Sequence, residues 1–303
     1  MSAFDAGPLG DSHGPLVASG NLRRRRRVDH LMRGLATTAA IGAVAVLVIV
    51  IVTVVEKGAS QLSIPFLTKD PVDTLNGVGG GIANALVGTG LIVALATAMA
   101  LPIGVLIALY LTEFSTPRTA RPIRLVLDLL NGLPSIVIGV FVYGLLIQGS
   151  SEVGWAGSFG LAIIMVPLIA RSAGEMLMLV PRELRDASHA LGMSRWRTIV
   201  GIVLPSALGG IVTGTVLAVA RAAGETAPLL FVSGIFSNNT TVDIFGASLP
   251  NIPVMIFQLS ESAVPTDHAR AWGAALVLIV LILIGNLGAR TMLARQRRKL
   301  AAR

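Results

Sequence analysis

The sequence Asp186-Ala-Ser-His-Ala-Leu-Gly192, which continues to Ile202-Val-Leu-Pro205, is a polar stretch between two long apolar segments of the chain. It contains two arginines and a tryptophan, and it ends in Leu-Pro immediately before the next apolar run. A membrane protein that keeps such a helical segment outside the lipid usually presents it to another molecule. We call this stretch the polar loop (Asp186–Pro205), and its apolar surroundings predict the fold.

The composition is that of a membrane protein. Hydrophobic residues form 53% of the 303 residues and charged residues only 13%, whereas soluble domains carry about 25% charged residues. The mean hydropathy is +0.78. The net charge of +8 could indicate a nucleic-acid partner, but positive charge on a membrane protein first reports its topology. The chain has no cysteine, which excludes disulfides and thiolate metal sites.

Six segments reach the length of roughly 20 apolar residues that a helix needs to cross the hydrocarbon core. We place them at Leu35–Val55, Ile82–Leu111, Leu125–Gln148, Val153–Leu179, from Pro205 to Phe236, and Ala271–Ala289. The predicted fold is therefore all-α, with six transmembrane helices and a short cytoplasmic helix between the fourth and fifth. It divides into a basic cytoplasmic tail (1–33), a six-span domain (34–295) and a second basic tail (296–303).

The amino-terminal segment is expected to stay attached. Residues 1–22 are rich in Gly, Ser and Pro without a periodic apolar face, so we expect them to be disordered. A cleaved signal peptide is the alternative reading of the first span. However, its apolar run of about 21 residues exceeds a signal core, and Val-Val-Glu-Lys follows it instead of a small-residue cleavage site.

The basic residues predict the orientation. The amino terminus, the loop after the second span, the polar loop and the carboxy terminus hold most of the 24 Lys and Arg. Lys57, Lys69 and Arg270 fall on the opposite side, and Arg171 and Arg221 lie within spans. The positive-inside rule then places both termini and the polar loop in the cytoplasm of a bacterial inner membrane.

The polar loop itself is expected to contain two helical pieces. Ala187 and Ala190 give the first piece a small face that can lie against another surface. Gly192 permits a chain reversal that a side chain would resist. Ser194 can cap the second piece, and Pro205 stands where the first turn of the fifth span needs no donor.

The spacing of the polar loop resembles that of the inner-membrane subunits of ABC importers. These subunits carry Glu-Ala-Ala, three residues, Gly, nine residues, Ile, one residue and Leu-Pro, and the present chain departs from the pattern at Asp186 and Ser188. The resemblance implies that the short helix docks in a groove of a separate ATPase subunit. The residues that it assigns to ATPase coupling are Asp186, Ala187, Ser188, Gly192, Ile202, Leu204 and Pro205. An ordinary amphipathic helix at the membrane interface is the alternative.

Charged residues also occur inside the predicted spans. Arg221 and Glu225 are four apart and share one face of the fifth span, and Arg171 and Glu175 repeat the arrangement on the fourth. Burying a charge in mid-span costs on the order of 3 kcal/mol, so such residues face the bundle interior or a water path. Each pair could be a structural ion pair within its helix or could take part in gating. Asp128 is an interfacial anchor or a partner for an arginine.

A second motif resembles the PstA permease family of phosphate importers. It is Arg221-Ala-Ala-Gly-Glu-Thr-Ala-Pro-Leu-Leu-Phe231, whereas the sister PstC family shares its Arg…Gly-Glu-Thr core but diverges afterwards. Gly224 within it indicates close helix packing or a local break. Further matches are Asn131-Gly-Leu-Pro-Ser-Ile-Val-Ile-Gly139, Leu249-Pro-Asn-Ile-Pro-Val-Met-Ile-Phe257 and Ala271-Trp-Gly-Ala-Ala-Leu-Val-Leu278, so that the resemblance covers residues from about 75 to 295.

The second resemblance implies the partners and the cargo. They are a PstC-like permease subunit, two copies of an ATPase that uses ATP and Mg, and an external phosphate-binding protein. Arg221, Glu225 and Thr226, with Arg171 and Glu175, would then belong to the substrate path or its gating. A cation in a low-dielectric path lowers the cost of carrying a dianion.

Three other readings remain. A permease for sulfate or molybdate would share the polar loop but not the segment after Arg221. A self-contained secondary transporter normally shows inverted repeats, which this sequence does not display. An enzyme would need a catalytic or metal constellation, but the histidines are scattered, and the glycines at 77–81 lack the Lys-Ser/Thr of a phosphate loop. We therefore expect no catalytic residue, metal or cofactor in this chain and no binding of nucleic acid.

Overall fold

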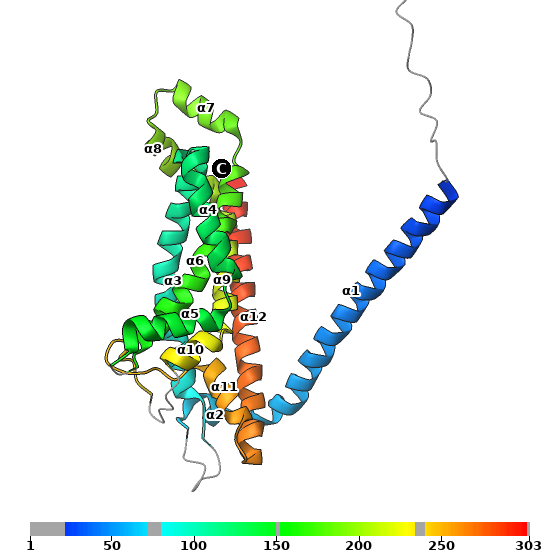
Figure 1. Ribbon diagram of the computed structural model, residues 1–303, viewed down its shortest axis with the longest axis vertical. Coiled ribbons are helices and arrows are strands. Elements are labelled where there is room, and N and C mark those ends of the chain that lie inside the picture. The colour runs from blue at the N-terminus through cyan, green and yellow to red at the C-terminus, as the bar shows by residue number, and fades with distance from the viewer. Residues whose placement is uncertain (1–21, 72–79, 150–151, 234–239, 302–303) are drawn as a thin grey trace, which may run out of the picture. The chain divides into compact units, whose positions relative to one another are not determined.

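The computed structural model is built from helices, and it describes residues 22–71, 80–149, 152–233 and 240–301 (Figure 1). Among these residues no strand occurs. The helices are α1 (Leu22–Gly58), α2 (Ile64–Thr68), α3 (Ala83–Leu109), α4 (Pro117–Gly132), α5 (Ser135–Val142), α6 (Gly154–Met178), α7 (Arg182–Ala190), α8 (Arg195–Thr198), α9 (Leu204–Ala223), α10 (Ala227–Val232), α11 (Ile252–Ser260) and α12 (Pro265–Ala301). Short 3-10 or π turns follow four helices: η1 (Ala59–Gln61), η2 (Tyr110–Phe114), η3 (Tyr143–Ile147) and η4 (Ile199–Val203).

The chain separates into two compact units, Met1–Thr53 and Val54–Arg303. The first contains most of α1, a helix of 37 residues whose side chains are exposed from Arg24 to Ile51. This helix includes the predicted first span and extends back to Leu22. Part of the expected amino-terminal tail is therefore helical, because an arginine run is compatible with a helix. The remainder of that tail lies outside the described residues.

In the second unit α3, α6, α9 and α12 form a bundle (Figure 1). Small residues allow close approach between the helices. Gly104 of α3 faces Ile169 of α6 so closely that a Cβ there would lie 2.8 Å from Ile169 Cγ2. Gly214 of α9 leaves similarly little room against Ser172. Such packing is typical of membrane helices, since lipid tails remove the hydrophobic drive that joins helices in water.

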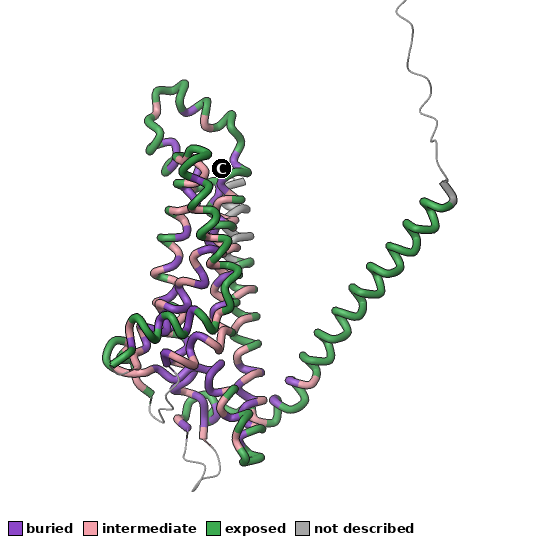
Figure 2. The backbone as a smooth tube through the Cα atoms, viewed as in Figure 1, coloured by how far each residue is buried: buried purple, intermediate pink, exposed green. Residues whose placement is uncertain are grey.

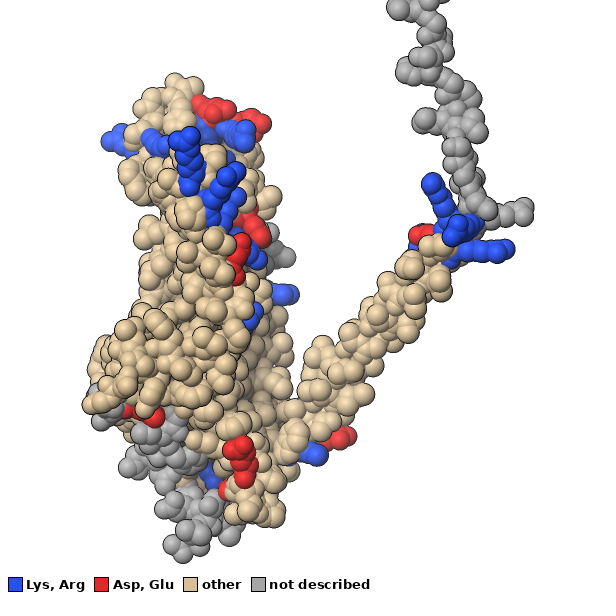
Figure 3. Space-filling view, in the orientation of Figure 1, with Lys and Arg blue, Asp and Glu red and all other residues tan. Residues whose placement is uncertain are grey.

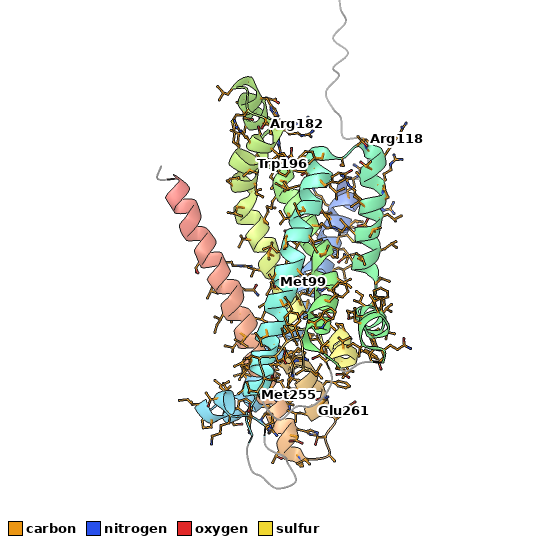
Figure 4. The ribbon with its side chains drawn as sticks, turned by 90° about the vertical axis from the view of Figure 1, so that its left-hand side faces the viewer. Met99, Arg118, Arg182, Trp196, Met255 and Glu261 are labelled. Atoms are coloured by element: carbon orange, nitrogen blue, oxygen red, sulfur yellow. The ribbon has the colours of Figure 1, made fainter. Side chains whose placement is uncertain are left out.

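Buried residues concentrate inside this bundle, whereas α7 is almost wholly exposed (Figure 2). Arg118, Arg182 and Trp196 lie at one end of the bundle, and Met255 and Glu261 lie at the other (Figure 4). Lys and Arg side chains gather at the first of these ends (Figure 3), and α12 also terminates there (Figure 1). We call it the basic end. This arrangement is the one that the positive-inside count predicts for a single membrane face.

The predicted third span is not a continuous helix. Instead, α4 begins at Pro117 and ends at Gly132, and the segment formed by α5 and η3 leaves it at an angle of 99°. Pro134 explains the break, because the residue before a proline avoids the helical region, and Leu133 is extended. Within the described residues five helices are long and apolar enough to span a membrane, or six if this bent pair counts as one span.

The predicted fifth span, from Pro205 to Phe236, is not one continuous helix. The helix begins at Arg195, ten residues before Pro205, and runs to Ala223. A π turn, η4, immediately precedes the turn that contains Pro205 and widens the helix where the proline ring cannot donate a hydrogen bond. After Ala223 the helix breaks, as Gly224 indicates, and α10 follows. The predicted end at Phe236 lies outside the described residues.

The outer limits of the bundle also differ from the sequence boundaries. The last helix, α12, begins at Pro265 and not at Ala271, and it continues to Ala301 through the expected carboxy-terminal tail.

Opposite the basic end, the main-chain N–H of Ile252 donates to Thr89 Oγ1 over 2.9 Å. This bond ties the start of α11 to α3 and closes the end of the bundle.

We predict that Gly88→Ala destabilises the protein by about 1–3 kcal/mol, the usual cost of overpacking. A Cβ at Gly88 would overlap the carbonyl oxygen of Pro250, which is backbone and cannot rotate away. The midpoint of thermal unfolding in detergent measures the effect. Gly90→Ala is the matched control, because open space surrounds a Cβ at that position of the same helix. Equal midpoints for the two variants would contradict the close approach.

Candidate functional site: the α7–α8 loop and the broken spans

The α7 helix presents different residues on its two faces. Leu184, Ala187 and Leu191 recur at helical spacing and are exposed, with 44% exposure at Leu184 and 82% at Leu191. Arg185 is partly buried and Ser188 is buried, so that both side chains contact the rest of the chain. An exposed apolar row on an otherwise polar helix is a typical docking surface for another protein. The sequence pattern had drawn attention to Ala187 but not to the two leucines.

A left-handed glycine ends α7. Gly192 has φ of +75°, a conformation that costs other L-residues about 1–2 kcal/mol. Its N–H donates to the His189 carbonyl over 2.9 Å, and the Met193 N–H donates to the Ser188 carbonyl over 3.1 Å. These two bonds form a Schellman motif, which satisfies the last carbonyls of the helix. The predicted chain reversal at Gly192 is therefore confirmed.

Ser188 has a different place from the other predicted coupling residues. It is buried, and its hydroxyl oxygen lies 2.8 Å from Thr198 Oγ1, so that it ties α7 to α8. Asp186 and Ala187 are exposed. Ile202, Leu204 and Pro205 lie on the first turns of the long helix that leads into the bundle. The loop thus has an exposed part and an internal part, and Ser188 belongs to the internal part.

The α8 helix packs on η2, the π turn that extends α3 to Phe114 and that we call the α3 extension. The Trp196 ring centroid lies 5.9 Å from that of Phe114 in η2, and the Arg195 guanidinium carbon lies 4.6 Å from the centre of the same Phe114 ring. Ser194 occupies the N-cap position of α8, but its hydroxyl makes no capping bond. Its carbonyl instead accepts the Thr198 N–H over 3.0 Å.

Arg185 joins α7 to the bundle. Its guanidinium donates to the carbonyls of Val180 over 2.6 Å and Leu177 over 2.9 Å, close to the end of α6. It also forms an ion pair with Glu113 Oε1 of η2 at 3.0 Å. The two side chains are 19% and 11% exposed. No feature of the polar loop pattern pointed to this residue, because its ion-pair partner Glu113 lies 72 residues away in the sequence.

The charged residues of the fourth and fifth spans do not form the same kind of ion pair. Arg221 Nε lies 3.6 Å from Glu225 Oε1, as expected, although Glu225 stands just beyond the end of α9. Arg171 instead pairs with Asp128 of α4 at 2.5 Å. Glu175 is exposed and takes no part in an ion pair within the described residues. Of the two readings of Arg171 and Glu175, the ion pair within the fourth span does not form, because a neighbouring helix offers Arg171 a nearer carboxylate. The reading of Asp128 as a partner for an arginine is confirmed.

The two broken spans meet each other. Gly139 of α5 packs on α10, where a Cβ would lie 2.7 Å from Pro228 Cα. Thr226 is half-buried at the start of α10, and its carbonyl accepts the Leu230 N–H over 3.0 Å. The residues at the two breaks, Leu133 and Gly224, are exposed. Non-helical backbone at membrane depth is tolerated where protein covers it or water reaches it.

Arg221 lies beside one of these breaks with 56% of its side chain exposed. Such a charge avoids lipid for the same reason that the broken backbone does. The breaks and Arg221 therefore mark a face that a partner subunit or an aqueous path covers. Among the described residues, no group of three or more His, Asp or Glu side chains is placed to hold a metal ion.

Comparisons with known proteins agree with this architecture. Residues 100–300 match the family described as binding-protein-dependent transport system inner membrane component. The chain belongs to that family. It is 40% identical over 73% of its length to a phosphate transport system permease protein PstA 1 from Mycobacterium tuberculosis, of which the match covers 73%. It is 38% identical over 89% of its length to a PstA permease from Haemophilus influenzae, covering 96% of that protein.

Two solved structures show the same fold at low sequence identity. A chain of a bacterial alginate ABC transporter superposes with a TM-score of 0.64 at 15% identity, covering 91% of this chain and 98% of that one. A chain of the MetNI methionine ABC transporter gives 0.55 at 18% identity, covering 71% and 94%. The protein is thus a multi-pass membrane component of a transport system, and α7 lies within the part of the chain that matches the family.

We predict that Gly192→Val loosens the end of α7, because valine would have to adopt a left-handed backbone at a cost of about 1–2 kcal/mol. Proteolysis of the α7–α8 connection should accelerate while the bundle resists. Gly192→Asn is the control, because asparagine enters the left-handed region more readily. If the valine variant were cleaved as slowly as the wild type, the Schellman motif would not determine the order of this loop.

Proposed function

We propose that this chain is a permease subunit of an ATP-driven phosphate importer. The observation that carries the proposal is the likeness to permeases named for phosphate transport, together with an exposed arginine beside two broken spans. Arg221 supplies a positive charge at the place where the helical backbone opens. A fixed cation in a site of low dielectric offsets the cost of moving an anion through it.

The basic end is proposed to face the cytoplasm, with the carboxy terminus and α7 on that side. The proposal rests on the gathering of Lys and Arg there and on the positive-inside rule. It places the protein in a bacterial inner membrane. The amino terminus is assigned to the same side because the arginine run before the first span is basic too.

The proposed partners follow from the surfaces that this chain leaves open. The exposed apolar row of α7 fits a groove in an ATPase subunit, and the exposed breaks fit a second, PstC-like permease subunit. An external phosphate-binding protein would deliver the anion to the opposite end. ATP and Mg²⁺ would bind to the two ATPase copies and not to this chain, which carries no phosphate-loop motif.

In this arrangement Asp186, Ala187 and Gly192 belong to the element that meets the ATPase. Ile202, Leu204 and Pro205 carry its displacement into the long helix, and Ser188 keeps α7 and α8 together. Arg221, Glu225 and Thr226 line or gate the anion path at the α9–α10 break. Arg171 acts through Asp128, whereas Glu175 remains a candidate for gating.

The experiment that tests the function is ATP-dependent uptake by the reconstituted complex, with phosphate, sulfate and molybdate compared. We expect phosphate to be imported when the binding protein and both permease subunits are present. The purified chain alone should hydrolyse no ATP above background. Import of sulfate or molybdate in preference to phosphate would reassign the cargo, and ATP hydrolysis by the chain alone would contradict the role of a subunit without its own ATPase site.

We predict that Arg221→Gln lowers phosphate uptake by about 10- to 100-fold while the complex still assembles, since each tenfold change corresponds to roughly 1.4 kcal/mol of lost interaction. Arg221→Lys should retain part of the uptake because it keeps the charge. The rate of uptake into proteoliposomes measures both variants. Unchanged uptake in Arg221→Gln would leave the arginine with a structural role.

A further inference from the structure

We infer that Arg185 is the positioning residue that transmits movement of α7 to the membrane helices. This inference rests on the proposed function, in which an ATPase moves α7. Arg185 does not belong to the exposed apolar row of α7. It lies on the opposite face of α7 and connects that helix to two others.

The first observation is that α7 stands away from the bundle. A cavity of about 620 Å³ lies between them. On the side of α7 it is lined by Arg182, Asp186 and His189, and on the side of the bundle by Thr112 and Met178. A helix separated from its support by a cavity transmits little of a push through side-chain packing at that place, because a gap of about 0.5–1 Å already forfeits roughly a quarter to a half of the dispersion attraction.

The second observation is that the Arg185 side chain bridges this gap. Its guanidinium reaches the Leu177 and Val180 carbonyls close to the end of α6 and the Glu113 carboxylate at the end of the α3 extension. A guanidinium is a rigid planar fork that can donate several bonds in fixed directions. A displacement of α7 is therefore transmitted to both α3 and α6.

The third observation concerns what the two helices reach. The α6 helix carries Arg171, which holds α4 through Asp128 just before the break at Leu133. It also lies against α9, where Gly214 faces Ser172. A shift of α6 thus acts directly on the helices that end at the two breaks. The other connection from α7, through Ser188 to α8, leads along the chain into α9 and, through the contact of Trp196 with Phe114, to η2, but among the residues that the structure describes it makes no direct bond to the end of α6.

The test measures the phosphate imported per ATP hydrolysed in the reconstituted complex. We expect Arg185→Gln to lower this ratio by about tenfold, within the range typical of coupling between sites, while ATPase binding and hydrolysis persist. Glu113→Gln should lower it less, because the two carbonyl bonds remain. Arg185→Lys should give a ratio between those of Arg185→Gln and the wild type, since an ammonium keeps the charge but not the planar fork of donors.

The double variant decides whether the pair acts as a unit. Arg185→Gln with Glu113→Gln should have the same ratio as Arg185→Gln alone, because interacting residues are not additive. Arg118→Gln is the matched control. Arg118 is an exposed arginine at the same end of the bundle, and its side chain forms no hydrogen bond or ion pair with the described residues.

Three results would overturn the inference. Arg185→Gln or Arg185→Lys could keep the wild-type ratio. The double variant could show a reduction of the ratio equal to the product of the reductions in Arg185→Gln and Glu113→Gln. Assembly and hydrolysis could fall together with uptake in Arg185→Lys and Glu113→Gln, which would make the contact merely structural. A wild-type complex that imports no phosphate would contradict the proposed function instead, so the two failures are distinguishable.

Discussion

Hydrocarbon offers no hydrogen-bond partner to the backbone, and this constraint shapes the whole molecule. Every residue that crosses the membrane must satisfy its N–H and C=O groups within its own helix. The long helices α3, α6, α9 and α12 obey this requirement and pack through small residues such as Gly104 and Gly214. Wherever the chain departs from it, something other than lipid has to cover the backbone, and these departures mark the parts with a function.

The departures are concentrated at two places. Pro134 ends the helical course of α4, and Gly224 ends that of α9, and the short helices that follow, α5 and α10, pack on each other. Arg221 stands at the second break with its charge exposed. Two helix breaks and a cation in an otherwise apolar bundle are the features on which the proposed anion path rests.

The basic end carries a helix, α7, that is attached to the bundle in a different way. The α7 helix exposes its apolar row, ends in a left-handed glycine and connects to the bundle through Arg185 and Ser188. Both connections are polar, unlike the dense apolar packing of the spans: the Arg185 bonds cross a cavity, and the Ser188–Thr198 bond is buried. This makes α7 a separable part, which is what a docking element needs if it must move with a partner and still direct the helices behind it.

Much of this was predictable from local sequence. Long uncharged runs identify membrane helices, the arginine distribution predicts one basic face, and the spacing from Asp186 to Pro205 predicts a helix, a glycine turn and a second helix. These signals are local because a helix satisfies its own backbone. Gly224 likewise indicated a break in the fifth span. The third span was harder, since an internal proline can be tolerated, as Pro102 is within α3, or can bend the chain by 99°, as at Pro134.

The sequence by itself determined which segments are long and apolar enough to cross the membrane, which end is basic and where the α7–α8 loop lies, because all three depend on hydropathy, charge and spacing along the chain. The tertiary structure alone decided the pairings. Arg171 forms its ion pair with Asp128 and not with Glu175, and Arg185 forms one with Glu113 across a cavity. The physical reason is that an ion pair forms between whichever charges the packing brings within about 4 Å, and helix packing brings together residues that no spacing rule connects.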